Sequence, residues 1–420
     1  MLDIAQICKE AESASARLAL SDSASKNKAL LMLVQWLREN SGAIIHENEK
    51  DVAQARANGL SDALIDRLRL TPERVSSIAA DLENVIQLAD PVGEVFESGA
   101  LQNGLKTRKV RVPLGVIAVI YESRPNVTID VASLALKSGN AVILRGGSET
   151  IHSNRILAEG IRAALVGAGI DPAAVQFIDD PSRELVSQLL KMHRYVDMLI
   201  PRGGAGLHTY CRENSIIPVI TGGIGICHLF VDKSADLEKS IDVIRNAKIQ
   251  RPSVCNALDT VLVHKDIASD LVPRLTDVLR QDGVSFRVEE DLIQDLGIKA
   301  DEIVQTSGPD DFDTEWLSLV LGIRQVSGLD EAIAHIAAHS TGHSDGILTG
   351  DEENAKRFTH EVDSAVVYVN ASTRFTDGGQ LGLGAEVAVS TQRLHARGPM
   401  ALRELTTFKW VVEGDYQTRK

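Results

Sequence analysis

A cysteine in a polar, basic stretch is the residue whose type and setting most plainly suggest chemistry. Cys255 lies in segment 246–256, which reads NAKIQRPSVCN. A thiol beside basic side chains, just before a predicted strand, is placed to have a lowered pKa and to react as a thiolate. A cysteine is more often a small buried hydrophobe, and Cys8 and Cys227 lie in apolar stretches that fit this description. Cys211 is expected on a helix, so Cys255 is the candidate nucleophile.

Glycine-rich polar segments follow four of the predicted strands. They read ESRPN at 122–126, RGGSE at 145–149, PRGGAG at 201–206 and TGGIG at 221–225. Glycine lets backbone amides approach a phosphate closely, and amides at a helix start favour anions. One such loop is ordinary turn chemistry, but several at one edge of a parallel sheet indicate a nucleotide site. None completes G-x-G-x-x-G, so the usual dinucleotide fingerprint is absent.

One pair of histidines could be taken for a metal site. His339 and His343 are four residues apart and resemble a metal-binding pair on a helix. Gly342 between them predicts that the helix has already ended, and no carboxylate completes a ligand set. We therefore expect solvated histidines near a helix end and no metal. No Ser-His-Asp arrangement stands out.

The elements that position these residues follow from apolar periodicity. In the first hundred residues the pattern is helical, as in the repeat of Leu30, Leu33, Val34 and Leu37. Short continuous apolar runs begin at residue 115, and such runs are typical of parallel strands buried on both faces. They lie at 115–121, 141–144, 175–178, 196–200 and 217–220. Residues 115–221 are therefore predicted to form a doubly wound α/β domain with about five parallel strands.

A second α/β alternation follows, so the predicted fold class is α/β with two doubly wound domains. Its strands are expected at 226–231, 260–263, 319–326 and 365–369, and its helices at 234–247, 266–282 and 329–340. Segment 99–113, GALQNGLKTRKVRVP, is basic and β-prone, which suggests an exposed hairpin. An exposed strand edge can pair with another chain, so we expect oligomerisation there. The alternative is a surface loop.

Composition restricts the class of protein. The chain has 420 residues with 44 Lys and Arg against 58 Asp and Glu, and this net charge of −14 argues against nucleic-acid binding. A hydrophobic content of 44% excludes disorder. Four cysteines make no disulfide framework and suggest reduced thiols. The first residues resemble neither a signal nor a transit peptide, and no apolar run approaches the roughly 20 residues that span a membrane. We expect a cytoplasmic protein.

Five blocks of sequence together carry a resemblance that covers nearly the whole chain. They are VPLGVIAVIYESRPNVTIDVASLALKSGNAVILRGGSE, MLIPRGGAGLH, IPVITGGIGICH, NAKIQRPSVCN and VNASTRFTDGGQLGLGAEVAVSTQRLHARGP. The chain resembles the aldehyde dehydrogenase superfamily, and within it the glutamate-5-semialdehyde dehydrogenases. The resemblance implies an NADP-binding domain, a catalytic domain with the nucleophilic cysteine, and an oligomerisation hairpin with a C-terminal strand. The NADP-binding domain is expected at 1–98 and 114–224, and the catalytic domain at 225–398. The oligomerisation hairpin is expected at 99–113 and the C-terminal strand at 399–420.

The reaction implied by the resemblance is NADPH-dependent reduction of L-glutamate 5-phosphate to L-glutamate 5-semialdehyde, with release of phosphate, as the second step of proline biosynthesis from glutamate. Cys255 matches the family nucleophile, Asn126 the oxyanion-hole asparagine, and Glu315 the glutamate that binds the nicotinamide ribose. A homo-oligomer is expected. A transient contact with glutamate 5-kinase is a further expectation, because the acyl phosphate made by that kinase is labile.

The cofactor is expected to be NADP(H). Arg145 stands where the superfamily usually has a lysine near the adenosine ribose, and we expect Arg145 and Ser148 to face the 2′-phosphate. The alternative for Arg145 is an exposed charge at a strand end. The other candidate cofactor-binding residues are glycines of the same strand ends: Gly146, Gly147, Gly203, Gly204, Gly222 and Gly223.

The substrate is anionic while the protein is acidic, so local cations must bind it. The fork of an arginine suits both carboxylate and phosphate. The candidates lie in polar segments near the carboxyl terminus or beside Asn126 and Cys255, and the alternative for each arginine is a surface ion pair. They are Arg374 and Arg397 with Ser372 and Thr373, and in addition Arg124 and Arg251.

The residue at position 220 distinguishes a hydrolytic aldehyde dehydrogenase from the alternatives that keep a thioester away from water. Hydrolytic aldehyde dehydrogenases carry a water-activating glutamate where this chain has Ile220. An enzyme that must keep its thioester away from water should lack that base, which favours an acyl phosphate reductase. A CoA-acylating semialdehyde dehydrogenase also lacks it and is the nearest alternative. A non-catalytic scaffold of the same fold is disfavoured by the joint presence of Cys255, Asn126 and Glu315.

Overall fold

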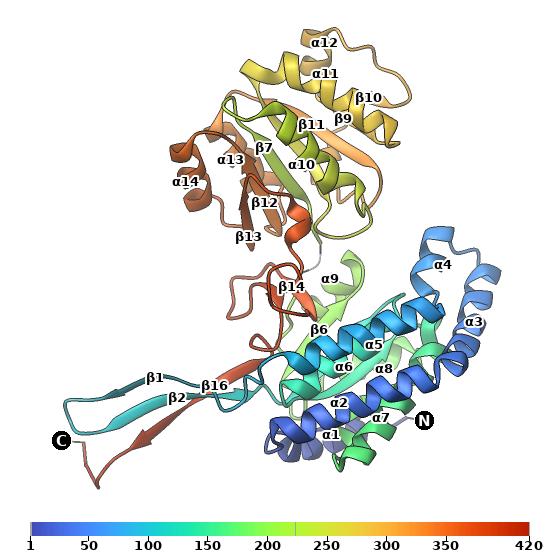
Figure 1. The fold of residues 1–420 in the computed structure, drawn as a ribbon, viewed down its shortest axis with the longest axis vertical. Coiled ribbons are helices and arrows are strands. Elements are labelled where there is room, and N and C mark those ends of the chain that lie inside the picture. Colours follow the sequence, from blue (N-terminus) through green and yellow to red (C-terminus); the bar gives the residue numbers. More distant parts are fainter. Residues whose placement is uncertain (1, 223, 420) are drawn as a thin grey trace. The chain divides into compact units, whose positions relative to one another are not determined.

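The computed structural model describes residues 2–222 and 224–419, which form two compact units (Figure 1). The first unit contains 2–221, 382–388 and 400–419. The second contains 222, 224–381 and 389–399. Because the chain returns to the first unit twice near its end, residues far apart in sequence share each unit.

Helices account for most of the first hundred residues, as predicted. The side chains of Asp3, Asp22 and Thr71 accept hydrogen bonds from backbone N–H groups at three of the helix starts, and Pro72 occupies the first turn after Thr71. These helices are α1 (Ile4–Leu18), α2 (Ser23–Glu39), α3 (Ser41–Ala57), α4 (Asp62–Leu68) and α5 (Pro72–Gln87).

The first unit is built on a four-stranded sheet with the order β5-β4-β3-β6, in which all neighbouring pairs are parallel. Its strands are β3 (Val116–Tyr121), β4 (Ala141–Gly146), β5 (Val175–Phe177) and β6 (Met198–Arg202). The helices between them are α6 (Asn126–Lys137), α7 (Ile151–Ala168), α8 (Arg183–Leu189) and α9 (Ala205–Asn214), with short 3₁₀ turns η1 (Ser148–Thr150) and η2 (Pro172–Ala174). Every residue of β3 and β4 is buried, which confirms the predicted burial on both faces.

The prediction of a fifth strand at 217–220 is wrong. The structure replaces it with an isolated parallel bridge between Leu199 and Val219. The N–H groups of Leu199 and Ile220 still donate across this contact, but Pro218 has no N–H to extend the ladder.

The segment around 99–113 forms an antiparallel hairpin, as expected, although it begins at Val95. It consists of β1 (Val95–Ala100) and β2 (Lys106–Pro113), and β16 (Thr406–Glu413) pairs with β2 on the other side. We call this three-stranded sheet, with the order β1-β2-β16, the arm. Phe408, Trp410 and Val412 alternate along β16, and all three are exposed.

The second unit is a seven-stranded parallel sheet in the order β10-β9-β11-β8-β7-β12-β13. Its strands are β7 (Cys227–Val231), β8 (Leu258–His264), β9 (Ser285–Val288), β10 (Val304–Thr306), β11 (Val320–Val326), β12 (Ser344–Leu348) and β13 (Val366–Val369). Its helices are α10 (Leu237–Ile249), α11 (Lys265–Gln281), α12 (Glu290–Leu296), α13 (Leu329–His339) and α14 (Glu352–Glu361), with 3₁₀ turns η3 (Asp311–Asp313) and η4 (Thr373–Phe375). The strands β9, β10 and β12 were not anticipated.

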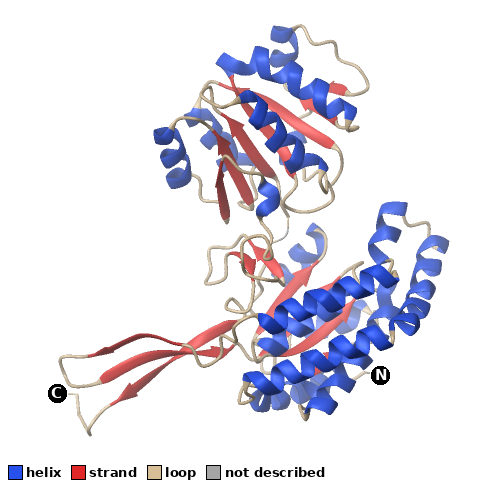
Figure 2. Ribbon diagram, viewed as in Figure 1, coloured by secondary structure: helices blue, strands red, loops and turns tan. Residues whose placement is uncertain are grey.

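Helices cover both faces of this sheet (Figure 2). Leu229 of β7 packs with α10 and α11, whereas the next residue, Phe230, packs with α13 and α14. This alternation gives the sheet two apolar faces and leaves the strand ends to carry polar residues. The two short strands β14 (Ala388–Ser390) and β15 (Gly398–Met400) pair with each other where the chain passes between the units.

Within the described residues, no helix is long and apolar enough to span a membrane.

Candidate active site

Cys255 differs from the other three cysteines in its exposure. Cys8, Cys211 and Cys227 are buried, whereas Cys255 is half-buried. Burial raises the pKa of the Cys8 thiol to about 12 and that of Cys211 to about 11, and it also raises the pKa of Cys227. Such thiols react slowly because the thiolate is the nucleophile. Among the four, Cys255 has the accessibility that a nucleophile requires.

Residues 251–257, here called the cysteine loop, connect α10 to β8. A turn in which the N–H of Ala257 donates to the Val254 carbonyl gives the loop local structure. The start of β7 packs against it: the Sγ of Cys227 donates to the Cys255 carbonyl at 3.3 Å. A Cβ on Gly225 would lie 1.5 Å from the same carbonyl oxygen. Gly225 is thus required for the close approach of two backbone segments.

The structure brings Glu315 to the same place in the second unit. Its Oε1 accepts a hydrogen bond from the N–H of Gly225 at 2.9 Å. The next residue, Trp316, donates its N–H to Asp259, and Asp259 forms a fully buried ion pair with Lys248. Sequence reasoning missed this ion pair. Neither Lys248 in α10 nor Asp259 in β8 gives a local signal that they meet, because charged residues are ordinarily exposed.

Arg374 and Arg251 supply positive charge beside the cysteine loop. Burial lowers the pKa of Arg374, repulsion from Arg251 lowers it further, and the Cys255 thiolate opposes this shift. The Nε of Arg374 donates to the side chain of Gln250 at 2.7 Å. Arg374 is therefore within electrostatic reach of both the Cys255 thiol and Arg251. Positive charge at this place favours both the thiolate and a bound anion.

The other carboxyl-terminal candidates have different surroundings. Thr373 is fully buried, and its Oγ1 donates to the Asn256 carbonyl at 2.7 Å. Ser372 is also buried and caps the η4 turn through the N–H of Arg374. The guanidinium of Arg397 is engaged by the side chain and carbonyl of Asp363. The candidates adjoining the cysteine loop are therefore those of the η4 turn.

In the first unit, Asn126 begins α6, and its amide nitrogen donates to Asp130 at 2.8 Å. The preceding loop bends sharply, with Ser123 at φ 50°. Arg124 contributes positive charge to this region, where it lowers the pKa of Asp130.

Arg145 ends β4 but is not the exposed charge of the alternative hypothesis, since it is 8% exposed. Burial lowers its pKa, while Glu149, Glu122 and Asp180 raise it. One guanidinium nitrogen donates to the Pro181 carbonyl, and Nε has no hydrogen-bond partner in the described part of the chain. An unsatisfied buried donor at a strand end fits a ligand that carries acceptor oxygens.

The candidate glycines are not equivalent. A Cβ on Gly146 would meet Asn154, and one on Gly147 would meet Glu149, so both accommodate the protein's own side chains. A Cβ on Gly203 would likewise meet the side chain of Glu122, whereas a Cβ on Gly204 would have no atom within 4 Å. Gly222 pairs with Ser390. Gly223 lies outside the described residues.

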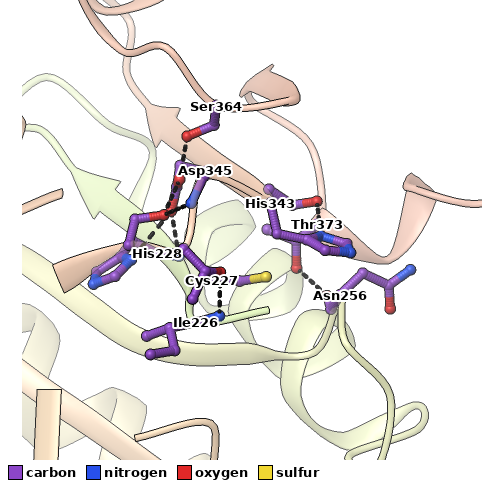
Figure 3. A network of polar contacts seen from close by, with 12 residues as sticks. Ile226, Cys227, His228, Asn256, His343, Asp345, Ser364 and Thr373 are labelled. Atoms are coloured by element: carbon purple, nitrogen blue, oxygen red, sulfur yellow. Dashed lines mark hydrogen bonds and ion pairs between the residues drawn. The ribbon is translucent and has the colours of Figure 1, made fainter. Parts of the chain in front are cut away.

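The predicted end of the helix before Gly342 is confirmed, since α13 ends at His339. The expectation that both histidines are solvated is wrong for His343, which is fully buried and lies 2.8 Å from the Ser344 hydroxyl through Nδ1. Beside it, Asp345 accepts hydrogen bonds from the His228 backbone and from Ser364 (Figure 3). Among the residues that the structure describes, no group of three or more potential ligands is placed to hold a metal ion.

Comparison with known proteins identifies the family to which this two-sheet α/β fold belongs. The model of the aldehyde dehydrogenase family matches residues 2–293 of this chain. The fold and this match define an oxidoreductase of the aldehyde dehydrogenase family.

More specific relatives cover the whole chain. A gamma-glutamyl phosphate reductase of Escherichia fergusonii is 56% identical over 409 residues, which are 97% of this chain and 98% of the relative. One from Yersinia enterocolitica is 56% identical over 98% of each chain. The crystal structure of gamma-glutamyl phosphate reductase from Thermotoga maritima superposes with a TM-score of 0.96 at 46% identity, covering all of both chains. The chain belongs to the gamma-glutamyl phosphate reductase family.

Proposed function

We propose that the protein reduces L-glutamate 5-phosphate to L-glutamate 5-semialdehyde with NADPH and releases phosphate, through a thioester on Cys255. Full-length identity of 56% to gamma-glutamyl phosphate reductases supports the reaction. The observation that carries the mechanism is the half-buried thiol of Cys255 within electrostatic reach of Arg374, which in turn interacts with Arg251.

The chemistry follows from the thiolate and its cations. The Sγ of Cys255 attacks the acyl carbon, and the bond from that carbon to the phosphate oxygen breaks, so phosphate leaves with the electron pair. Arg374 and Arg251 stabilise the departing negative charge. NADPH, when bound, would supply the hydride that reduces the thioester carbon. The bond from that carbon to Sγ then breaks, which releases the aldehyde and returns the Cys255 thiolate. We assign Asn126 to donate to the oxyanion, and a donor of this kind is worth about 3 kcal/mol of barrier.

The preference for NADP(H) is proposed from Arg145. Its buried guanidinium has an unsatisfied Nε, and the adjacent Ser148 begins a 3₁₀ turn. A cation and a hydroxyl at a strand end suit the 2′-phosphate of NADP, while Gly204 leaves open space for backbone amides to approach the cofactor. Glu315 remains the proposed contact for the nicotinamide ribose.

We further propose that the protein is a cytoplasmic homo-oligomer assembled through the arm. The support is the row of Phe408, Trp410 and Val412, which are exposed on an edge strand. A transient contact with glutamate 5-kinase is proposed from the lability of the acyl phosphate.

The decisive experiment is the reverse reaction, in which glutamate 5-semialdehyde reduces NADP in the presence of inorganic phosphate. Wild-type activity should require phosphate, and Cys255→Ala should lose essentially all of it. Cys211→Ala, in a buried thiol of the first unit, is the matched control and should remain active. Activity without phosphate would indicate hydrolysis, and activity only with CoA would indicate the acylating branch; either would contradict the proposal.

A further inference from the structure

The turn at 372–376, here called the clamp, contacts the chain on both sides of Cys255. After the cysteine, Thr373 Oγ1 donates to the Asn256 carbonyl at 2.7 Å, and the Asn256 amide nitrogen donates to the Thr376 carbonyl at 2.8 Å. Before the cysteine loop, Arg374 Nε donates to Gln250 at 2.7 Å. Figure 3 shows Thr373 and Asn256 facing each other.

The clamp is itself fixed to the sheet. The Thr376 hydroxyl lies 2.7 Å from that of Tyr368 on β13 and 2.6 Å from that of Ser344 on β12. Upstream, Asn370 adopts φ 54°, and its side chain exchanges hydrogen bonds with the backbone of Thr349. A turn held by two strands can impose its geometry on a loop that has little regular structure of its own.

The Thr373 hydroxyl connects the clamp to the backbone beside Cys255. Thr373 is fully buried and Asn256 is 5% exposed, so their hydrogen bond is shielded from water. The hydroxyl donates to the carbonyl of the residue that follows Cys255 and therefore fixes the backbone at the nucleophile. Removing the donor leaves a buried carbonyl unsatisfied, and the loop must shift to satisfy it.

We infer that Thr373 is a positioning residue, which holds the backbone of Asn256 so that the Cys255 thiol stays beside Arg374 and Arg251. This inference rests on the proposed function of Cys255. It replaces the expectation that the Thr373 side chain binds substrate. A small displacement of a reacting group lowers the rate strongly, because productive geometry is narrow.

The test compares Thr373→Val, which keeps the shape and removes the hydroxyl, with Thr373→Ser, which keeps the hydroxyl. Two quantities are measured: the steady-state constants of the phosphate-dependent reverse reaction, and the rate of Cys255 alkylation by iodoacetamide in the enzyme without substrate. Thr373→Val should lower kcat about tenfold or more with little change in KM for phosphate. It should also slow alkylation at pH 7, because the thiol moves away from the two arginines. Thr373→Ser, which keeps the hydroxyl, should retain the wild-type kcat and the wild-type rate of Cys255 alkylation.

The matched control is Thr276→Val in α11 of the same unit. Thr276 is buried, and its hydroxyl donates to the carbonyls of Val272 and Pro273 within its own helix, so this variant removes a buried hydroxyl donor away from the cysteine loop. It should leave kcat and alkylation unchanged. Alkylation is followed on the peptide that contains residue 255, with Cys255→Ala as the blank.

The outcomes are distinguishable. If Thr373→Val raises only KM for phosphate and alkylation is unchanged, the side chain binds substrate and the positioning role is overturned. If kcat, KM and alkylation all remain at wild-type values, the clamp is irrelevant to the thiol and the inference is also overturned. The proposed function fails separately, if Cys255→Ala itself retains activity.

Discussion

Asp130 is a residue whose ionisation should be visible in stability. Burial raises the pKa of its carboxyl from 3.8 to about 6; the hydrogen bond from Asn126 lowers it, Asp81 raises it, and Arg202 and Arg124 lower it. The folded carboxyl keeps its proton up to about pH 6, whereas the unfolded one loses it near 3.8. The folded state therefore binds more protons in this window, and its stability falls as the pH rises through it.

Asp130→Asn removes the ionisable group and keeps an acceptor for the Asn126 amide. At pH 7.5 we expect the free energy of unfolding to exceed that of wild type by about 1–3 kcal/mol, because the wild-type protein must ionise a buried carboxyl whose pKa is raised. Near pH 4 the two proteins should be about equally stable, because the wild-type carboxyl is then protonated. Urea unfolding at both pH values checks this. If the two proteins differed equally in free energy of unfolding at both pH values, the raised pKa of Asp130 would be contradicted.

Arg145 is the residue on which the cofactor preference depends. Arg145→Ala removes the cation proposed to face the 2′-phosphate, so the ratio of kcat/KM for NADPH over NADH should fall about tenfold or more. The increase in Tm caused by saturating NADP should shrink in parallel, because ligand stabilisation follows affinity. Arg155→Ala, an exposed arginine on α7 paired with Asp179, is the control. An unaltered preference in Arg145→Ala would refute the role.

At the scale of elements, the start of β7 and the cysteine loop must touch backbone to backbone. Gly225→Ala would place a Cβ 1.5 Å from the Cys255 carbonyl, and neither backbone can move without disturbing the loop. Overpacking of this kind typically costs about 1–3 kcal/mol, so Tm should fall and kcat should drop further than KM changes. Gly308→Ala in the same unit meets only Asp311 at 3.7 Å or beyond and should be neutral. Wild-type kinetics for Gly225→Ala would show that the loop tolerates the shift.

At the scale of the whole molecule, the arm should decide assembly. Trp410 is 56% exposed on β16, in line with Phe408 and Val412. Trp410→Glu places a charge in this apolar row and should shift the protein toward its monomer in sedimentation or light scattering. Thr407→Glu adds the same charge to the opposite face of the strand and should leave the mass unchanged. If both variants keep the wild-type mass, assembly does not use this row.

Local patterns of residues were enough to predict the type and place of most elements. Val116–Tyr121 is a continuous apolar run, and such a run is stable only where both faces are covered, so a parallel strand follows from local composition. Gly342 correctly predicted the end of α13. The short strands β9 and β10 were missed because three or four residues carry too little periodicity. Cys255 was chosen from its polar, basic setting and the candidate arginines from the segments in which they lie, whereas the roles of Asn126 and Glu315 came from the resemblance.

Which polar groups meet depends on how the chain folds in three dimensions. Thr373 and Asn256 are 117 residues apart, and Glu315 and Gly225 are 90 apart. Hydropathy reports how deeply a residue is buried but not its partner, because the partner depends on strand order and loop path. Thr373 therefore resembled a substrate contact in the sequence, and the fold shows its hydroxyl bonded to the backbone beside the candidate nucleophile.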